Sequence, residues 1–180
     1  MVKRILLLSG PMASGKSSIS QFLQENHGFA AISSGTFLRE QLVVRSKPID
    51  RHHLQELGDA LDAATDFSWI IESVARPNID AQPHIDNWIL DAVRKPRQIE
   101  LFRLNYAESI RHVHVVAPES VLQRRYAERG VGLLAQYHAS VSHPNEQSAR
   151  SLATHADKVV DTDELTLVEI ANQILKDWER

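Results

Sequence analysis

A phosphate-binding signature near the N-terminus constrains this chain more than any other feature. Gly10–Ser17 reads G-P-M-A-S-G-K-S and satisfies the pattern G-x-x-x-x-G-K-[ST] in full. The pattern requires a buried strand before it and a helix after it, and the sequence offers both. Ile5–Ser9 is a short continuous apolar run, and Ser17–Asn26 carries apolar residues at helical spacing. The motif and its context therefore predict a loop that holds a nucleoside triphosphate.

Each fixed position of the motif has a chemical reason. Gly10 and Gly15 permit backbone angles that turn successive amide groups inward around phosphate oxygens. A helix that begins near Lys16 directs its positive dipole end at the same anion. Lys16 then reaches the β- and γ-phosphates, and the Ser17 hydroxyl ligates Mg2+. We expect the phosphates to be bound by Gly10, Ala13, Ser14, Gly15, Lys16, Ser17 and Ser18.

Short apolar runs alternate with helical patterns along the whole chain, which predicts an α/β fold of one domain, residues 1–180. Such alternation is typical of a parallel sheet with helices on both faces. No repeat, low-complexity tract or linker divides the chain. Five strands are predicted, at Ile5–Ser9, Phe29–Ile32, Trp88–Leu90, His112–Ala117 and Lys158–Asp161.

Two segments look like insertions on this core. Residues 50–76 read as two or three helices without a strand, and Pro77 is expected to stop the last of them. Residues 130–149 have weak periodicity and several histidines, which predicts a mobile, lid-like segment. Upstream of both, Thr36 is expected to cap a helix that continues to the break at Lys47-Pro48.

Asp91 follows a buried strand, at the edge where α/β sheets gather their ligands. Such a carboxylate holds the water shell of Mg2+ or orients the attacking hydroxyl; the alternative is that it only caps a turn. Cations near the same edge would stabilise the transferring phosphoryl group, the alternative being a solvated charge run. The favoured candidates are Arg39, Arg94, Arg125 and Arg129, with Arg97 and Arg124 less favoured.

The bulk composition excludes several classes of protein. The chain has no cysteine, which rules out disulfides, zinc-thiolate sites and thiol nucleophiles. Its formal net charge of -3 gives no general reason to bind nucleic acid or an anionic membrane. No apolar stretch approaches the ~18 residues of a membrane span, so the cytoplasm is the expected location. The nine histidines show no metal-binding spacing, and His112 and His114 are expected to be structural.

Four segments resemble the nucleoside monophosphate kinase family, including adenylate kinases and dephospho-coenzyme A kinases. They are the Gly10–Ser17 loop, Ser33–Arg39, Trp88–Gln98 and Arg125–Arg129, and Ala156–Asp161 resembles a strand near the C-terminus of many of these kinases. Leu54–Gly58 and Asp91–Arg103 are similar to a subgroup of deoxynucleotide-type kinases.

The resemblance implies a three-layer P-loop fold with a helical acceptor-binding insertion and a lid. It implies that Arg39 and Arg94 hold the acceptor's phosphate, while Arg125 and Arg129 stabilise the transferring phosphoryl group. Lys16 and Asp91 complete the expected catalytic set, with Ser17 and Asp91 as metal ligands. The chain departs from the family at Thr36, where adenylate kinases have aspartate, and at Ala92, where they have glycine.

The leading hypothesis is a kinase that transfers the γ-phosphoryl group of ATP, with Mg2+, to a (deoxy)nucleoside monophosphate. A second hypothesis is a kinase of a larger acceptor, either dephospho-coenzyme A or a modified base in DNA. A hypothesis of a different class is a P-loop ATPase or a regulatory nucleotide-binding protein. GTPases need an N-K-x-D sequence to read the base, and the chain has none.

Overall fold

The computed structural model describes residues 3–91, 93–130 and 133–178. Across these residues the chain forms a five-stranded parallel sheet with the strand order β2-β3-β1-β4-β5. The predicted α/β class and the predicted parallel sheet are therefore confirmed. The strands are β1 (Arg4–Ser9), β2 (Phe29–Ala31), β3 (Asn87–Leu90), β4 (Ile110–Val116) and β5 (Lys158–Asp161).

Helices fill the connections between the strands and extend beyond them. Between β1 and β3 lie α1 (Lys16–His27), α2 (Ser34–Val44), α3 (Arg51–Thr65), the π-helix η1 (Ile70–Ala75) and α4 (Arg76–Ala81). Between β3 and β4 lie α5 (Pro96–Tyr106) and the short 3-10 helix η2 (Ala107–Ser109). Between β4 and β5 lie α6 (Glu119–Ala127), α7 (Leu133–Val141), α8 (Pro144–Ser151) and the 3-10 helix η3 (Leu152–His155). The C-terminal part contains α9 (Leu167–Leu175) and η4 (Lys176–Trp178).

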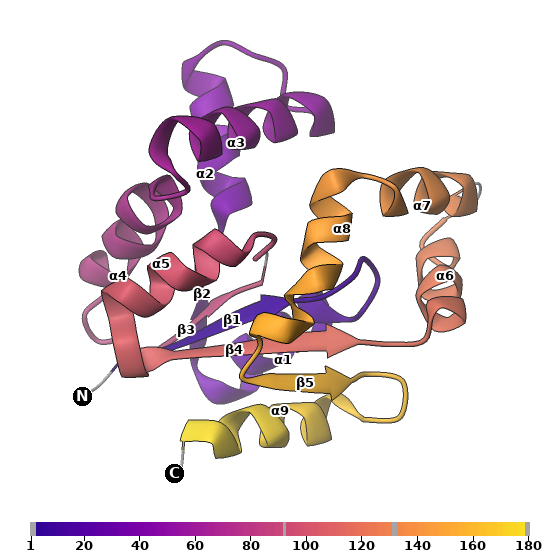
Figure 1. Ribbon diagram of the computed structural model, residues 1–180. Helices are drawn as coiled ribbons and strands as arrows, with labels where there is room; N and C mark the ends of the chain where they lie inside the picture. The colour runs from indigo at the N-terminus through magenta and orange to yellow at the C-terminus, as the bar shows by residue number, and fades with distance from the viewer. Residues whose placement is uncertain (1–2, 92, 131–132, 179–180) are drawn as a thin grey trace.

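Both faces of the sheet are covered, as the continuous apolar strands predict (Figure 1). Side chains alternate between the two faces along a strand, so the four consecutive residues Ile5–Leu8 of β1 are all fully buried. Leu6 and Leu8 pack with α1 and α9. Ile5 and Leu7 pack with η1, α4 and α5 on the other face.

Because all the strands are parallel, their carboxyl ends meet at one edge of the sheet. The loop after β1, Asp91 after β3 and Thr162 after β5 therefore come together, as ligand-binding segments do in open α/β sheets. On either side of this edge, α2 and α3 stand away from the sheet at the top of Figure 1, and α6 to α8 lie at its right.

The weak periodicity of residues 130–149 did not reveal two helices that the structure shows there. Residues 133–151 form α7 and α8, with a short connection between them. Neither helix is longer than nine residues, so a helical period had little length in which to show itself. Tertiary packing stabilises both: Tyr137 of α7 and Ala149 of α8 are buried.

Two predictions about helix ends are wrong. Ser33, rather than Thr36, caps α2, and its hydroxyl accepts a hydrogen bond from the Thr36 amide at 3.1 Å. Pro77 does not stop the preceding helix, because it lies in the first turn of α4, directly after η1. Proline is tolerated in the first turn of a helix, since its fixed φ angle suits that turn.

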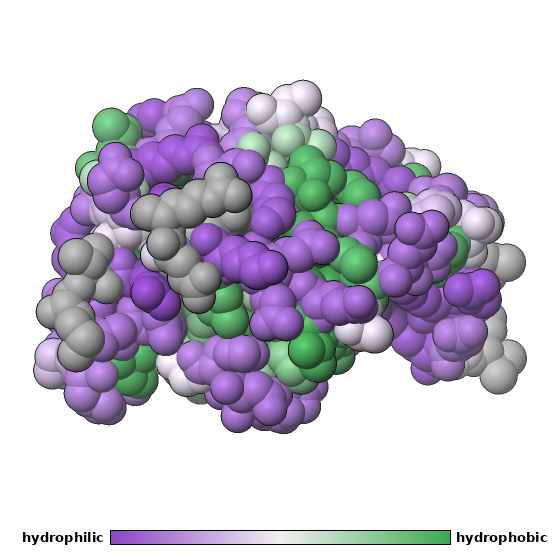
Figure 2. Space-filling view, turned by 90° about the horizontal axis from the view of Figure 1, so that it is seen from below, coloured by the Kyte–Doolittle hydropathy of each residue, from purple (hydrophilic) through white to green (hydrophobic). Residues whose placement is uncertain are grey.

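The surface seen from below in Figure 2 is largely hydrophilic, with apolar residues scattered over it. In Figure 1 β5 and α9 lie on this side, and they carry exposed apolar side chains at Val159, Leu167 and Val168. Among the residues that the structure describes, no helix has the length and apolar character needed to cross a membrane.

Candidate functional site: the phosphate loop and two adjoining cavities

The loop between β1 and α1 has a backbone that turns its amide groups inward. Gly10, Ala13 and Gly15 all have positive φ angles, of 139°, 64° and 92°. A Cβ on Gly10 would lie 2.2 Å from the carbonyl oxygen of Val115, so the neighbouring strand β4 excludes any side chain there. Gly15 leads directly into the first turn of α1, whose free amides face the loop. This is the backbone form of an anion-binding nest.

Lys16 spans this loop. Its Nζ donates to the carbonyl oxygens of Gly10 at 2.8 Å and Pro11 at 2.7 Å. Burial of the ammonium group lowers the pKa of Lys16 to about 8, an effect that the nearby carboxylate of Glu146 partly opposes. Arg94 and Arg129 lower the same pKa and Asp91 raises it, so all four charges act on one ammonium group.

A cavity of about 350 Å³ opens in front of the loop and contains most of the predicted phosphate site. All seven residues predicted to bind phosphate line it, together with two predicted catalytic residues, Asp91 and Arg129. Arg94, predicted to hold the acceptor, lines it as well. The remaining lining residues are Met12, Val93, Ser140, His143, Asn145, Glu146 and Ala149.

Ser17 and Asp91 are the metal-binding candidates of this cavity. Ser17 is exposed at the start of α1, and Asp91 is partly buried after β3. A hydroxyl and a carboxylate suit Mg2+, which keeps several water molecules and takes further oxygens from substrate phosphates. The chemistry of this donor set therefore fits a metal that arrives with a nucleotide.

The two predicted lid arginines lie in different surroundings. Arg129 lines the cavity, and its guanidinium carbon lies 5.7 Å from the centre of the Tyr126 ring. Arg125 does not line the cavity but donates to the hydroxyl and the carbonyl oxygen of Thr162, at 2.9 and 2.8 Å. The Thr162 hydroxyl in turn lies 3.0 Å from the carbonyl oxygen of Ser14. Arg125 therefore supports the phosphate loop through Thr162.

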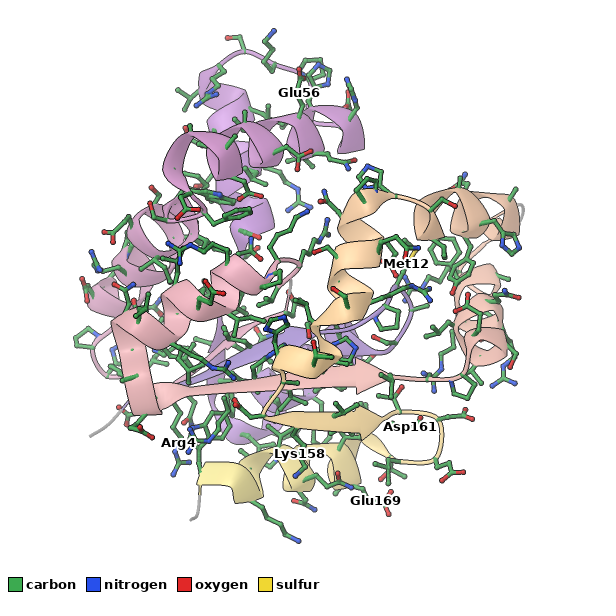
Figure 3. All side chains as sticks on the ribbon, viewed as in Figure 1. Arg4, Met12, Glu56, Lys158, Asp161 and Glu169 are labelled. Atoms are coloured by element: carbon green, nitrogen blue, oxygen red, sulfur yellow. The ribbon has the colours of Figure 1, made fainter. Side chains whose placement is uncertain are left out.

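Glu146 is the main residue of the cavity that the sequence did not reveal. The amide of Met12, inside the phosphate loop, donates to its Oε1 at 2.7 Å, and Met12 lies beside α8 in Figure 3. The carboxylate of α8 therefore occupies an amide that belongs to the anion-binding nest. The four-residue spacing of Glu146 and Arg150 is that of a helical ion pair, and the two side chains lie 3.2 Å apart. No local signal indicates that the pair faces the loop.

Arg150 connects Glu146 to a second polar cluster. Its guanidinium donates to Glu119 of α6 at 2.9 Å and to the Tyr137 hydroxyl at 3.1 Å. The Tyr137 hydroxyl in turn donates to Glu119 at 2.6 Å. Burial of this hydroxyl is the main reason why the pKa of Tyr137 is raised to about 12. The network ties α6, α7 and α8 together, so these helices hold Glu146 against the loop.

A second cavity, of about 570 Å³, lies between α2, α3 and the segment that leads from β3 into α5. It contains both predicted acceptor-binding residues, Arg39 and Arg94. Arg94 and Asn145 line both cavities, so the two spaces meet at these residues. Other polar residues line this second cavity without having been singled out from the sequence, among them Gln55, Asp59, Asp62, Lys95 and Gln98.

The remaining candidates lie outside the cavities. Arg97 forms ion pairs with Asp66 at 2.7 Å and Glu100 at 3.1 Å, and Arg124 lies 4.0 Å from Glu128. Thr36 is exposed in the first turn of α2. Ala92, the departure from glycine, lies outside the described residues.

A buried polar chain lies beneath the phosphate loop. His112 Nδ1 donates to the carbonyl oxygen of His155 at 3.1 Å, which leaves Nε2 to accept from the Ser9 hydroxyl at 2.7 Å. The Ser9 oxygen then accepts from His114 Nδ1 at 2.8 Å. Burial lowers the pKa of both imidazoles, that of His114 to about 4, so both rings are neutral at physiological pH. This arrangement supports a structural role for the two histidines.

Comparison with known proteins agrees with the fold and the loop. An adenylate kinase of Mycoplasmopsis pulmonis is 30% identical over 144 residues, which cover 77% of this chain and 64% of that protein. The chain thus spans less than two thirds of that relative. TT1252 of Thermus thermophilus has the same fold, with a TM-score of 0.64 and 18% identity over 98% of both chains. A gluconokinase of Sinorhizobium meliloti gives a TM-score of 0.52 and 17% identity, covering 99% of this chain and 93% of its own.

The parallel sheet, the phosphate loop after β1 and the adjoining cavity define a P-loop protein of the nucleotide kinase-like type. A family profile described as "AAA domain" matches residues 6–133, which include most of β1, the phosphate loop and β2 to β4. The chain belongs to this family. The resemblance inferred from the sequence motifs is thereby confirmed at the level of a P-loop, nucleotide kinase-like family.

Proposed function

We propose that the protein is an ATP- and Mg2+-dependent phosphotransferase, which moves the γ-phosphoryl group to a small nucleotide-like acceptor, a (deoxy)nucleoside monophosphate. The observation that carries the proposal is the meeting of the two cavities at Arg94 and Asn145. One cavity contains a triphosphate-binding loop, and the other contains two arginines suited to a second phosphate. A kinase needs two such spaces in contact, whereas a simple ATPase needs only the first.

The loop residues bind and orient the donor in this proposal. The inward amides and Lys16 neutralise the β- and γ-phosphates, and Lys16 must leave its two carbonyl partners to do so. Ser17 and, through water, Asp91 would hold Mg2+, which would supply further neutralisation of the triphosphate. The Met12 amide becomes available to phosphate only when Glu146 releases it.

The acceptor is held by Arg39 and Arg94, and its phosphate faces the loop because Arg94 lines both cavities. Arg129 stabilises negative charge on the transferring group, and Arg125 acts with it if α6 to α8 rearrange. In this scheme residues 1–180 form a single kinase domain. Residues 50–76 form its acceptor-binding helices, and residues 130–149 form its lid.

A coupled assay of ADP release tests the proposal directly. The panel contains the ribo- and deoxynucleoside monophosphates, dephospho-coenzyme A, gluconate and oligonucleotides, with Lys16→Ala as the blank. Acceptor-dependent release with a nucleoside monophosphate, lost in Lys16→Ala, is the expected result. Release that no acceptor stimulates would instead identify an ATPase, and absence of release despite ATP binding would identify a regulatory binding protein.

A further inference from the structure

The second cavity has walls of opposite charge. Helix α3 contributes Gln55, Asp59 and Asp62, which follow one another at spacings of four and three and so lie on one face of the helix. The opposing cations come from other elements: Arg39 from α2, and Arg94 and Lys95 from the segment before α5. In Figure 1 α3 lies above α5, with the sheet below them. A ligand that satisfies this cavity needs an anionic group and hydrogen-bond donors.

The basic wall is the one that adjoins the phosphate loop, because Arg94 also lines the first cavity. The amide of Arg94 donates to the Gln98 side chain at 3.0 Å, and its carbonyl oxygen accepts from Ser148 at 2.7 Å. The backbone at this position is therefore fixed from two sides. A phosphate bound by Arg94 would leave the rest of the acceptor beneath α3.

The carboxylates of α3 can only accept hydrogen bonds when ionised. Asp62 Oδ1 accepts from the Trp69 indole at 2.7 Å, which fixes the orientation of that carboxylate. Asp59 Oδ1 lies 3.5 Å from the Asn145 amide nitrogen, a long contact that a better donor can replace. The same cavity is also lined by the large apolar residues Leu38, Ile49, Leu54, Trp69 and Ile70, which suit the face of a planar ring.

We propose that the acceptor is a nucleoside monophosphate whose base carries an exocyclic amino group, and that Asp59 accepts a hydrogen bond from that group. The inference rests on the proposed kinase function and narrows its acceptor. Asp59 is then a specificity-determining residue of the same site. Asn145 must exchange its contact with Asp59 for the ligand, so binding of the acceptor also loosens one contact of α8 with α3.

Matched acceptors that differ at the amino position test this inference. The pairs are cytidine and uridine monophosphate, adenosine and inosine monophosphate, and guanosine and inosine monophosphate. In at least one pair we expect kcat/KM to favour the amino-bearing member by about tenfold or more. Isothermal titration of the same pairs with Lys16→Ala, which should still bind acceptor, gives a measure of recognition that needs no catalysis.

Asp59→Ala should remove this preference by weakening the amino-bearing acceptor about tenfold, with its partner changed by no more than about twofold. Glu56→Ala is the matched control, because Glu56 is exposed on the same helix, outside the cavity lining, and lies on its outer side in Figure 3. Alanine favours helix at both positions, so α3 is retained in each variant.

Three outcomes would overturn the inference. They are equal or reversed preference in all three pairs, an unchanged preference in Asp59→Ala, and a best acceptor that is not a nucleoside monophosphate. In each of these cases acceptor-dependent ADP release that Lys16→Ala abolishes would leave the kinase activity standing. Only a failure of every acceptor to stimulate release would remove the proposed function itself.

Discussion

The two cavities of this protein are built in different ways. The phosphate-loop cavity takes its backbone nest and Lys16 from one contiguous stretch, Gly10–Ser18, which begins after the buried strand β1 and runs into helix α1. The second cavity takes its polar groups from α2, α3, the segment before α5 and the start of α8, which are far apart in the sequence. A backbone nest suits any polyphosphate, whereas in the proposed function the side chains of the second cavity would distinguish one acceptor from another.

Residues at the boundary connect the two cavities. Arg94 and Asn145 line both cavities, and α8 contacts each side: Glu146 holds the Met12 amide, while His143 contacts the Gln55 side chain. A helix that touches both sites cannot move without changing both. The comparison therefore predicts that variants of the loop affect the donor, variants of α2 and α3 affect the acceptor, and boundary variants affect both.

The largest effect is expected from Lys16→Ala. Loss of the ammonium group removes the charge closest to the β- and γ-phosphates, and we expect kcat to fall about a thousandfold, as for other groups that stabilise a transition state. Acceptor-dependent ADP release measures this. Lys176→Ala, an exposed lysine near the C-terminus, should retain full activity. A loss of less than tenfold would mean that the loop does not carry the catalytic charge.

Arg94→Ala should come next, with a loss of about a hundredfold in kcat/KM for the acceptor. Because Arg94 lines both cavities, we expect kcat to fall and the acceptor KM to rise together. Arg39→Ala should raise only the acceptor KM, since Arg39 lines the second cavity alone. Arg45→Ala, at the exposed end of α2, is the control. Identical kinetic patterns in Arg39→Ala and Arg94→Ala would contradict a boundary role for Arg94.

The lowered pKa of Lys16 predicts that ATP binding weakens as the pH rises. The triphosphate requires the protonated ammonium, and in the free protein this group loses its proton near pH 8. The affinity for ATP is therefore highest below this pKa, and we expect the Kd to rise by about tenfold between pH 7 and pH 9. Isothermal titration measures the Kd, and Lys16→Ala should show a much flatter pH dependence. An equally steep dependence in that variant would assign the titration to another group.

The smallest effect is expected from Glu146→Gln. The carboxylate competes with phosphate for the Met12 amide and repels it, so its neutralisation should tighten ATP binding by about fivefold. Acceptor affinity should change less, since Glu146 lines only the first cavity. Glu128→Gln, on the exposed end of α6, provides the control. Weaker ATP binding in Glu146→Gln would show that the carboxylate helps to hold the donor instead of blocking it.

The strands were predictable because a strand buried on both faces is a continuous apolar run. Ile5–Ser9 and Trp88–Leu90 illustrate this, since their observed bounds differ from the predicted ones by one residue. The helices of residues 133–151 were missed because they are short and owe their stability to Tyr137 and Ala149, which pack against other elements.

That Gly10–Ser18 would line one cavity was predictable, because the conformation of the loop depends largely on glycines within the motif itself. The placement of Arg125 and Glu146 was not predictable. Arg125 is separated from its partner Thr162 by 37 positions, and Glu146 from Met12 by 134. No local pattern encodes which of several arginines at helical spacing faces a cavity and which supports a loop from behind.

The sequence by itself determined the parallel α/β architecture, the phosphate loop and the family to which the chain belongs. Only the tertiary structure decided that Arg94 lies between two cavities, that α3 presents carboxylates to the second, and that Glu146 holds an amide of the loop. The physical reason is the range of the interactions. Apolar periodicity and backbone angles are set by near neighbours in the chain, whereas the walls of a cavity are set by the packing of elements that the sequence keeps far apart.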